Sequence, residues 1–255
     1  MRFACLGSGS EGNALLVEAG ATRLLVDCGF GIRDTIARLG RIGVTSESIT
    51  AIIVTHEHSD HVGGVAAFAS RFGTPVWLTF GTLSAVTERF AGLPHVFGFD
   101  SHDSFAVDEI EVRPFPVPHD AREPVQFVFT DGQWRLGLLT DIGVSTVHVE
   151  ARLSGCDALV LECNHDRDML ANGDYPHSLK QRISGKLGHL DNDAAAGLLS
   201  RLDNSRLKHV FAAHLSRQNN RRELASAALA GVLGCTHDWI GIADQDDGFG
   251  WREFV

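Results

Sequence analysis

The sequence lacks any long hydrophobic segment. No apolar run in its 255 residues approaches the roughly 20 residues that a helix needs to cross a bilayer. The first stretch, MRFACLGSGSEGN, has one arginine followed by glycines, so it also lacks the apolar centre of a signal peptide. We therefore expect a cytoplasmic protein without membrane contacts.

Cysteines and basic residues are also scarce. The five cysteines are scattered, odd in number and form no C-x-x-C pair, which excludes a disulfide framework and a cysteine zinc site. The 22 lysines and arginines are outnumbered by 32 acidic residues, which gives a net charge of −10. Such a surface does not bind a polyanion non-specifically as a whole, although it still allows a local basic track.

The rest of the composition is that of an ordinary globular protein. Hydrophobic residues make up 44% of the chain and charged residues 21%, which excludes a disordered or fibrous chain. No internal repeat, low-complexity stretch or long linker divides the sequence. We expect residues 1–255 to form one domain, with no particular oligomeric state implied.

Strand-like and helical patterns interleave along the chain. Continuous apolar runs such as LLVD and AIIVTH indicate strands that are buried on both faces. The predicted strands are Phe3–Leu6, Ala14–Glu18, Thr22–Val26, Ala51–Thr55, Val76–Thr79, Glu109–Phe115, Val125–Thr130, Arg135–Thr140, Ala158–Glu162 and Val210–His214. The predicted helices are Ile32–Leu39, Val62–Phe72, Leu83–Phe90, Ser145–Leu153, Asn192–Leu202 and Arg222–Leu233. Because several strands follow one another directly, we predict an α/β fold with two mixed sheets packed face to face and helices outside.

Histidine is abundant, and its densest cluster predicts a metal site. Three of the 13 histidines belong to one H-x-H-x-D-H motif directly after a predicted buried strand, formed by His56, His58, Asp60 and His61. Neutral imidazoles and carboxylates are good ligands for zinc and related divalent ions. The spacing lets His56 and His58 face one ion, while the turn brings Asp60 and His61 towards a second.

Further polar residues end other predicted strands. Asp27, Asp141 and His214 each follow an apolar run, and His119 follows an extended segment that contains three prolines. Strand ends of an α/β scaffold meet at one edge, so we expect these residues to gather at one site. There, a carboxylate such as that of Asp141 could bridge two cations.

The order and spacing of these residues resemble the metallo-β-lactamase superfamily across nearly the whole chain. The resemblance implies an αββα sandwich and a pair of divalent ions, Zn²⁺ or alternatively Mn²⁺. The implied ligands are His56, His58 and His119 for one ion, Asp60, His61 and His214 for the other, and Asp141 between them. Two ions about 3.5–4 Å apart can share a hydroxide and clamp the oxygens of a substrate.

Glu162 and His189 indicate which bond is attacked. Glu162 ends a predicted buried strand, and His189 lies just before a predicted helix. A histidine outside the metal ligands can protonate a leaving oxygen, while a carboxylate fixes its tautomer and raises its basicity. We therefore expect phosphodiester cleavage, in which Asp60 orients the attacking hydroxide and His189 is the general acid.

This pair resembles the Glu and His motifs of the tRNA-processing enzyme RNase Z. The chain is more similar to the YycJ-like (WalJ) family, which implies 5′→3′ exonuclease activity on DNA. The matching stretches are GSGSEGN (7–13), LECNHD (161–166), YPHSLKQRI (175–183), GHL (188–190) and HLSRQNN (214–220). No long insertion resembles the arm with which RNase Z grips tRNA, so we expect DNA as the substrate.

Two short basic segments and the first glycine-rich loop provide candidate substrate contacts. One segment leads into His189 and the other follows His214, and positive charge at these places could hold a phosphate backbone. The expected contacts are Ser8, Asn13, Lys180, Arg182, Arg217 and Asn219. The alternative is that both segments are merely solvated helix faces.

These observations favour a two-metal phosphodiesterase that acts on nucleic acid. A small-molecule phosphodiesterase would share the catalytic residues and would differ only at the basic rim. A thioester or lactone hydrolase would leave Glu162 and His189 without a purpose. A metal-binding scaffold without activity would have no need for seven ligands and an outer acid.

Overall fold

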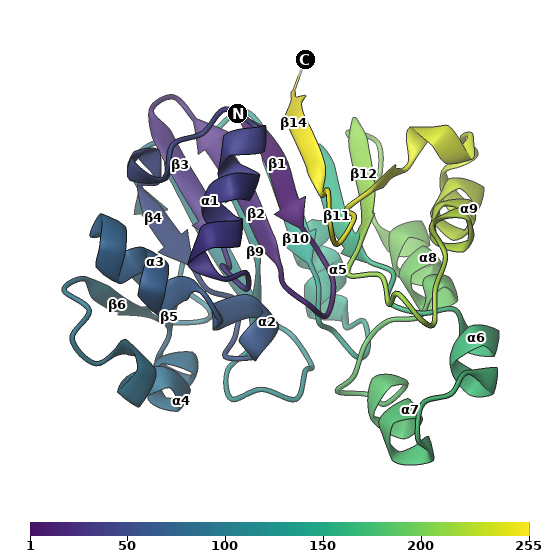
Figure 1. Ribbon diagram of the computed structural model, residues 1–255. Helices are drawn as coiled ribbons and strands as arrows, with labels where there is room; N and C mark the ends of the chain where they lie inside the picture. The colour runs from purple at the N-terminus through teal and green to yellow at the C-terminus, as the bar shows by residue number, and fades with distance from the viewer. Residues whose placement is uncertain (255) are drawn as a thin grey trace.

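The computed structural model describes residues 1–254, which form two seven-stranded sheets packed face to face (Figure 1). The first sheet has the order β14 (Phe249–Glu253), β1 (Arg2–Gly7), β2 (Ala14–Ala19), β3 (Thr22–Val26), β4 (Ala51–Ile53), β5 (Val76–Thr79) and β6 (Val96–Phe99). The second has the order β13 (Gly241–Ile242), β12 (His209–Ala213), β11 (Ala158–Glu162), β10 (Arg135–Leu139), β9 (Val125–Thr130), β8 (Ile110–Pro116) and β7 (Phe105–Val107). Both sheets are mixed, because β3–β6 and β10–β13 run parallel and the other pairs are antiparallel.

The strands are apolar on both faces because each sheet is covered on both sides. In β2, Leu15 and Val17 enter the core between the sheets, whereas Leu16 faces the outer helices. In β11, Val160 enters the same central core and Leu161 joins the outer core of the second sheet. This two-residue alternation between two buried environments explains why the sequence shows continuous apolar runs.

Helices cover the outer faces of the sheets, as Figure 1 shows. The first sheet packs against α1 (Ile32–Arg41), α3 (Val65–Phe72) and α4 (Phe80–Phe90). The second packs against α5 (Val147–Leu153), α8 (Asn192–Arg201) and α9 (Arg222–Leu233). The remaining short helices are α2 (Ser59–Val62), α6 (Arg167–Asn172), α7 (His177–Ile183), η1 (Ser46–Ser48) and η2 (His237–Trp239). The predicted αββα architecture is confirmed.

Several local predictions differ from the structure. The predicted helix Val62–Phe72 is interrupted at Gly63 and Gly64, where Gly64 lies too close to the Phe30 backbone to accept a Cβ. The strands β6, β7, β13 and β14 and the helices α6 and α7 were not predicted. Strand β14 has largely exposed residues, and α7 has no buried residue, so neither shows a clear apolar period.

Over residues 1–254, no helix is both long and apolar enough to cross a membrane. The finding agrees with the lack of long apolar runs in the sequence.

Candidate metal centre

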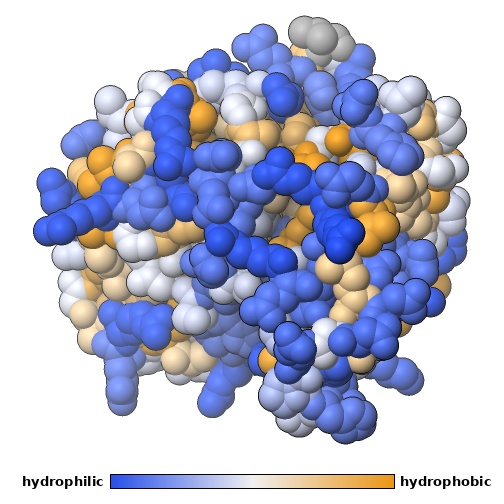
Figure 2. All heavy atoms as spheres, turned by 45° about the vertical axis from the view of Figure 1, so that its right-hand side comes forward, coloured by the Kyte–Doolittle hydropathy of each residue, from blue (hydrophilic) through white to orange (hydrophobic). Residues whose placement is uncertain are grey.

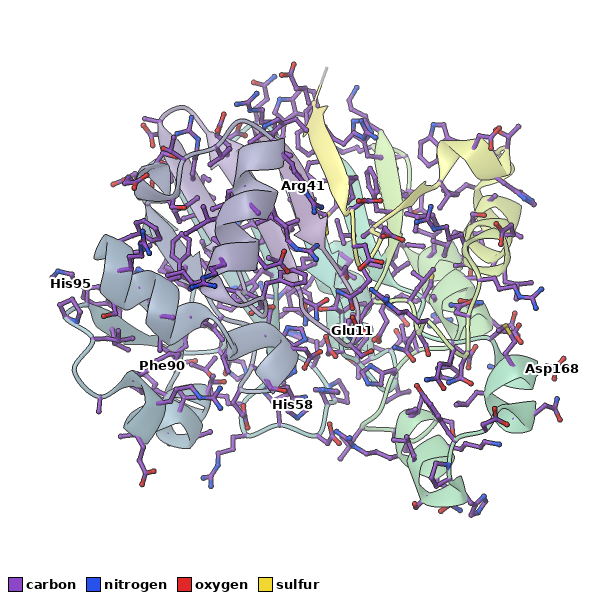
Figure 3. The ribbon with its side chains drawn as sticks, in the orientation of Figure 1. Glu11, Arg41, His58, Phe90, His95 and Asp168 are labelled. Carbon is purple, nitrogen blue, oxygen red and sulfur yellow. The ribbon has the colours of Figure 1, made fainter. Side chains whose placement is uncertain are left out.

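The site residues are presented by loops at the ends of strands from both sheets. In Figure 3, His58 lies at the lower edge of the molecule, between its two halves. Asp27, Asp141 and His214 follow β3, β10 and β12, and they adopt positive φ angles of 60°, 51° and 54°. A left-handed conformation costs a non-glycine residue roughly 1–2 kcal/mol, and such strain concentrates at functional sites. The backbone is therefore bent at the points where these side chains enter the site.

Each of the five histidines predicted as ligands has one ring nitrogen held by a neighbouring group. The contacts are His56 Nδ1 with Thr55 Oγ1 (3.0 Å), His58 Nε2 with the Asp120 carbonyl (3.2 Å), His61 Nδ1 with Asp27 Oδ2 (2.7 Å), His119 Nδ1 with the Gly188 carbonyl (3.2 Å) and His214 Nδ1 with Glu162 Oε1 (3.3 Å). Outer partners of this kind orient an imidazole and leave its second nitrogen for a metal ion. The arrangement is suited to binding divalent metal ions.

The second ring nitrogens meet in two adjacent groups. The ligand atoms of His56, His58 and His119 lie within 4.8 Å of one another, and so do those of Asp60, His61 and His214. Asp141 joins His56 and His61 in a further group within the same distance, so its carboxylate lies between the two sets. The first two groups are the sets that the family resemblance implied for two ions. A fourth group joins Asp141, Glu162, His189 and His214 within the same distance.

Three ligand atoms provide a test of whether a metal fits. In the described part of the chain, His56 Nε2, His214 Nε2 and Asp141 Oδ2 are buried without a hydrogen-bond partner. A buried polar atom without a partner is costly, and a cation in each of the two sets of ligands would satisfy these atoms. The nitrogen and carboxylate donors suit zinc and other divalent first-row ions.

The carboxylates of the centre hold protons on some imidazoles until a cation replaces them. Burial lowers the pKa of His56 well below its usual range. Burial also lowers the pKa of His214, but the neighbouring carboxylates of Asp141, Asp60 and Glu162 outweigh it and raise that pKa to about 10. Binding of a cation to the His214 imidazole would therefore release a proton.

Asp27 positions two ligands, a role that sequence reasoning did not assign. Its Oδ1 accepts from the Thr55 backbone N–H (2.8 Å), and its Oδ2 accepts from the Thr55 hydroxyl (2.8 Å) and lies 2.7 Å from His61 Nδ1. The Thr55 hydroxyl in turn contacts His56. The only sequence clue was the place of Asp27 after an apolar strand.

Glu162 is saturated with hydrogen bonds and orients His189. Its two oxygens accept from three backbone N–H groups, those of Asp141, Ile142 and Leu190, at 3.0–3.1 Å. His189 Nδ1 lies 2.8 Å from Glu162 Oε1. Burial raises the pKa of Glu162, but the charge and hydrogen bond of His189 outweigh it and lower the pKa to about 2. Glu162 is therefore a charged hydrogen-bond partner of His189 whose two oxygens both accept hydrogen bonds from the backbone.

Several of the candidate metal ligands line a hollow of about 230 Å³. Asp60, Asp141, His189 and His214 line it, and Arg182 lies at its rim, where Arg182 Nε is 2.6 Å from Asp120 Oδ2. The structure thus brings Arg182 to the site.

The other predicted substrate contacts have different surroundings. Ser8 is buried and accepts from the His214 backbone N–H (3.0 Å), and the Asn13 amide lies 3.2 Å from His61 Nε2. Lys180 donates to the Ala171 carbonyl (2.8 Å) and lines a neighbouring hollow, and Asn219 is buried. Arg217 lies in a separate groove that shares Ser216 with this hollow.

The chain matches a known protein family, and that family agrees with the geometry of the site. Residues 22–210 match the family described as the beta-lactamase superfamily domain. The chain belongs to the metallo-β-lactamase superfamily. Within it, the chain is 36% identical to exodeoxyribonuclease YycJ of Bacillus anthracis over 235 residues, 91% of this chain and 89% of the relative. It is 32% identical to exodeoxyribonuclease WalJ of Streptococcus pneumoniae (strain D39) over 247 residues, 94% of this chain and 91% of the relative.

A comparison of structures supports the same fold. The metallo-β-lactamase fold protein YhfI of Bacillus subtilis superposes with a TM-score of 0.77 at 16% identity, covering 99% of both chains. The predicted resemblance to the YycJ/WalJ family is confirmed by the two sequence relatives. The protein is a hydrolase of the metallo-β-lactamase fold, with a histidine and aspartate cluster suited to divalent metal ions.

Proposed function

We propose that this hydrolase cleaves the phosphodiester bonds of DNA and removes nucleotides from the 5′ end. The observation that carries the proposal is the Glu162–His189 pair, 2.8 Å apart, at the edge of the metal ligands. The His189 side chain is 18% exposed and faces the hollow, whereas Glu162 is fully buried behind it. An oriented acid beside two metal positions suits the release of an alkoxide from phosphorus.

His189 is arranged to donate a proton. Burial lowers its pKa, but the charge of Glu162 and its hydrogen bond outweigh burial and raise the pKa above the usual range. With Nδ1 held by Glu162, the proton on Nε2 is free for transfer. As the water oxygen bonds to phosphorus and the bond from phosphorus to the leaving oxygen breaks, that proton passes to the leaving oxygen.

The remaining chemistry depends on divalent ions. The first set would be His56, His58 and His119, the second Asp60, His61 and His214, with Asp141 between them. When bound, the ions would polarise the phosphate oxygens and lower the pKa of water. The Asp60 side chain is 21% exposed towards the hollow, where it can accept a hydrogen bond from the attacking water. We propose Zn²⁺ as the ion because imidazole suits it, with Mn²⁺ as the alternative because the set also contains the carboxylates of Asp60 and Asp141.

A groove beside the metal hollow offers a path for the strand. It contains Arg217, Arg221 and Arg222, and it shares Ser216 with the hollow. Within residues 1–254, the Arg221 guanidinium forms no ion pair and is available for a phosphate. Figure 2 shows that the face over the C-terminal half is mostly hydrophilic, with small apolar patches. The names of the relatives, exodeoxyribonucleases, agree with a DNA substrate and attack at an end.

One observation favours a second candidate, a hydrolase of small phosphodiesters. Arg217 pairs with Asp246, and Arg222 pairs with Asp244, so acidic neighbours offset much of the positive charge of the groove. A small substrate would need only the metal hollow and His189.

Digestion of end-labelled DNA duplexes with added Zn²⁺ or Mn²⁺ distinguishes these functions, with a His189→Ala variant beside the wild type. Stepwise shortening from the 5′ end that is lost in the variant supports the proposal. Intact DNA together with cleavage of bis(p-nitrophenyl) phosphate would favour the small-substrate function. An enzyme that cleaves neither would contradict phosphodiester chemistry altogether.

A further inference from the structure

One wall of the metal hollow is apolar and is formed by α7 and the turn before it. Tyr175, Leu179 and Ile183 line the hollow together with the candidate metal ligands and His189. Leu179 and Ile183 are four residues apart, so they lie on one face of the helix. Figure 1 shows α7 projecting from the lower edge of the molecule, away from the sheets.

This wall does not serve the packing of the fold. No residue of α7 is buried, and Tyr175, Leu179 and Ile183 are each partly exposed. Tyr175 is the single tyrosine of the chain, and in the described residues its hydroxyl has no hydrogen-bond partner. An aromatic ring and two aliphatic side chains facing a polar hollow provide a flat apolar surface that metal and phosphate chemistry does not require.

Hydrogen bonds connect this wall to neighbouring segments of the chain. Arg182 Nε lies 2.6 Å from Asp120 Oδ2, and the Asp120 N–H donates to the Leu187 carbonyl (3.1 Å). The His189 N–H donates to the Ile183 carbonyl (2.8 Å), which connects α7 directly to the proposed acid. These hydrogen bonds connect α7 to the segment that carries His119 and Asp120 and to His189.

We propose that Tyr175, supported by Leu179 and Ile183, is the surface on which the base of the terminal nucleotide stacks. The inference rests on the proposed nuclease function and specifies how its substrate is held. With the base against Tyr175, the sugar-phosphate faces the metal ligands. The strand then leaves across Ser216 into the groove that contains Arg217, Arg221 and Arg222. Stacking of a base on an aromatic side chain is tolerant of sequence, so the surface selects nucleotides without selecting among bases.

The test compares DNA strands whose 5′-terminal residue is either a normal nucleotide or an abasic tetrahydrofuran. The wild-type enzyme is expected to have a KM roughly 5- to 150-fold lower for the normal end, the range that one stacked base provides. Tyr175→Ala should remove this ratio, whereas Tyr175→Phe and Tyr175→Trp should retain most of it because the ring is kept. Phe80→Ala, which removes an aromatic ring exposed by 61% and outside the hollow, should leave the ratio unchanged.

The outcomes separate this inference from the proposed function. Wild-type cleavage of normal and abasic ends with the same KM would overturn the stacking inference and leave the nuclease function standing, and this result needs no variant to fold. A ratio lost equally in Tyr175→Phe and Tyr175→Ala would also overturn it, because the hydroxyl would then be the essential group. No cleavage of any strand by the wild type would overturn both proposals. Metal content and melting temperature, measured for every variant, verify that the centre is intact.

Discussion

Replacing Asp27 by asparagine should weaken metal binding without any ligand being removed. Asparagine tolerates the positive φ of Asp27 well, so the backbone is not strained by the change. The new amide group would, however, face the Thr55 hydroxyl and His61 Nδ1 as a donor. The preferred tautomer of His61 would then carry its proton on Nε2, which can no longer bind a cation.

The Thr55 hydroxyl extends this effect to the other set of ligands. In the wild type it donates to Asp27 and is therefore free to accept from His56 Nδ1 at 3.0 Å. With an amide donating to it, the hydroxyl would donate to His56 instead and change the tautomer of that ring as well. Loss of one such outer partner lowers metal affinity about 10- to 100-fold, or roughly 1.4–2.7 kcal/mol.

The assay is competition for Zn²⁺ between the protein and a chromophoric chelator. We expect both binding events of Asp27→Asn to be weakened within that range, and the ¹⁵N shifts of the imidazoles to report the changed tautomers. Asp108→Asn is the matched control, because Asp108 also has a positive φ (48°) but lies in the turn between β7 and β8. Affinities within twofold of the wild type, with unchanged tautomers, would refute the role assigned to Asp27.

Three further changes test other parts of the site. His189→Gln should reduce DNA cleavage about 10²- to 10⁴-fold with unchanged metal content, and a loss of metal would instead identify His189 as a ligand. The pKa of His214 is raised to about 10, so in the metal-free protein its imidazole is protonated below pH 10. Zn²⁺ must displace that proton, and the Zn²⁺ affinity should therefore rise with pH up to about pH 10. Calorimetry in buffers of different ionisation enthalpy should record the proton release, and an affinity that is flat between about pH 6 and 8 would count against it. Gly29→Ala should lower the free energy of unfolding by about 1–3 kcal/mol in urea titrations, because a Cβ would overlap the Asp60 carbonyl. Gly31→Ala, where no atom lies within 4 Å of a Cβ, should show no such loss.

The fold and the ligand types could be read from the sequence because both depend on local order along the chain. Apolar runs such as LLVD indicate strands buried on both faces, and two covered sheets are the way to bury many such strands. The H-x-H-x-D-H motif places several donors within six residues, so the residues from His56 to His61 are close in any fold. The same reasoning predicted Glu162 and His189 as partners, and the structure brings them to 2.8 Å.

Other features depended on contacts between residues far apart in the sequence. Lys180 and Arg182 look alike as basic residues, yet two positions along a helix separate them by about 200°, and only Arg182 faces the metal hollow. Helix α7 has no buried face, so no period in the sequence indicated it or the Tyr175 surface beside it.

The tertiary structure alone decided which nitrogen of each histidine is available to a metal. A sequence specifies that an imidazole is present, but the free nitrogen depends on the partner of the other one. For His61 that partner is Asp27, which is 34 residues away, and for His214 it is Glu162, which is 52 residues away. Such pairings arise only when separate strands end side by side, because each strand brings its own polar residue to the shared edge of the two sheets.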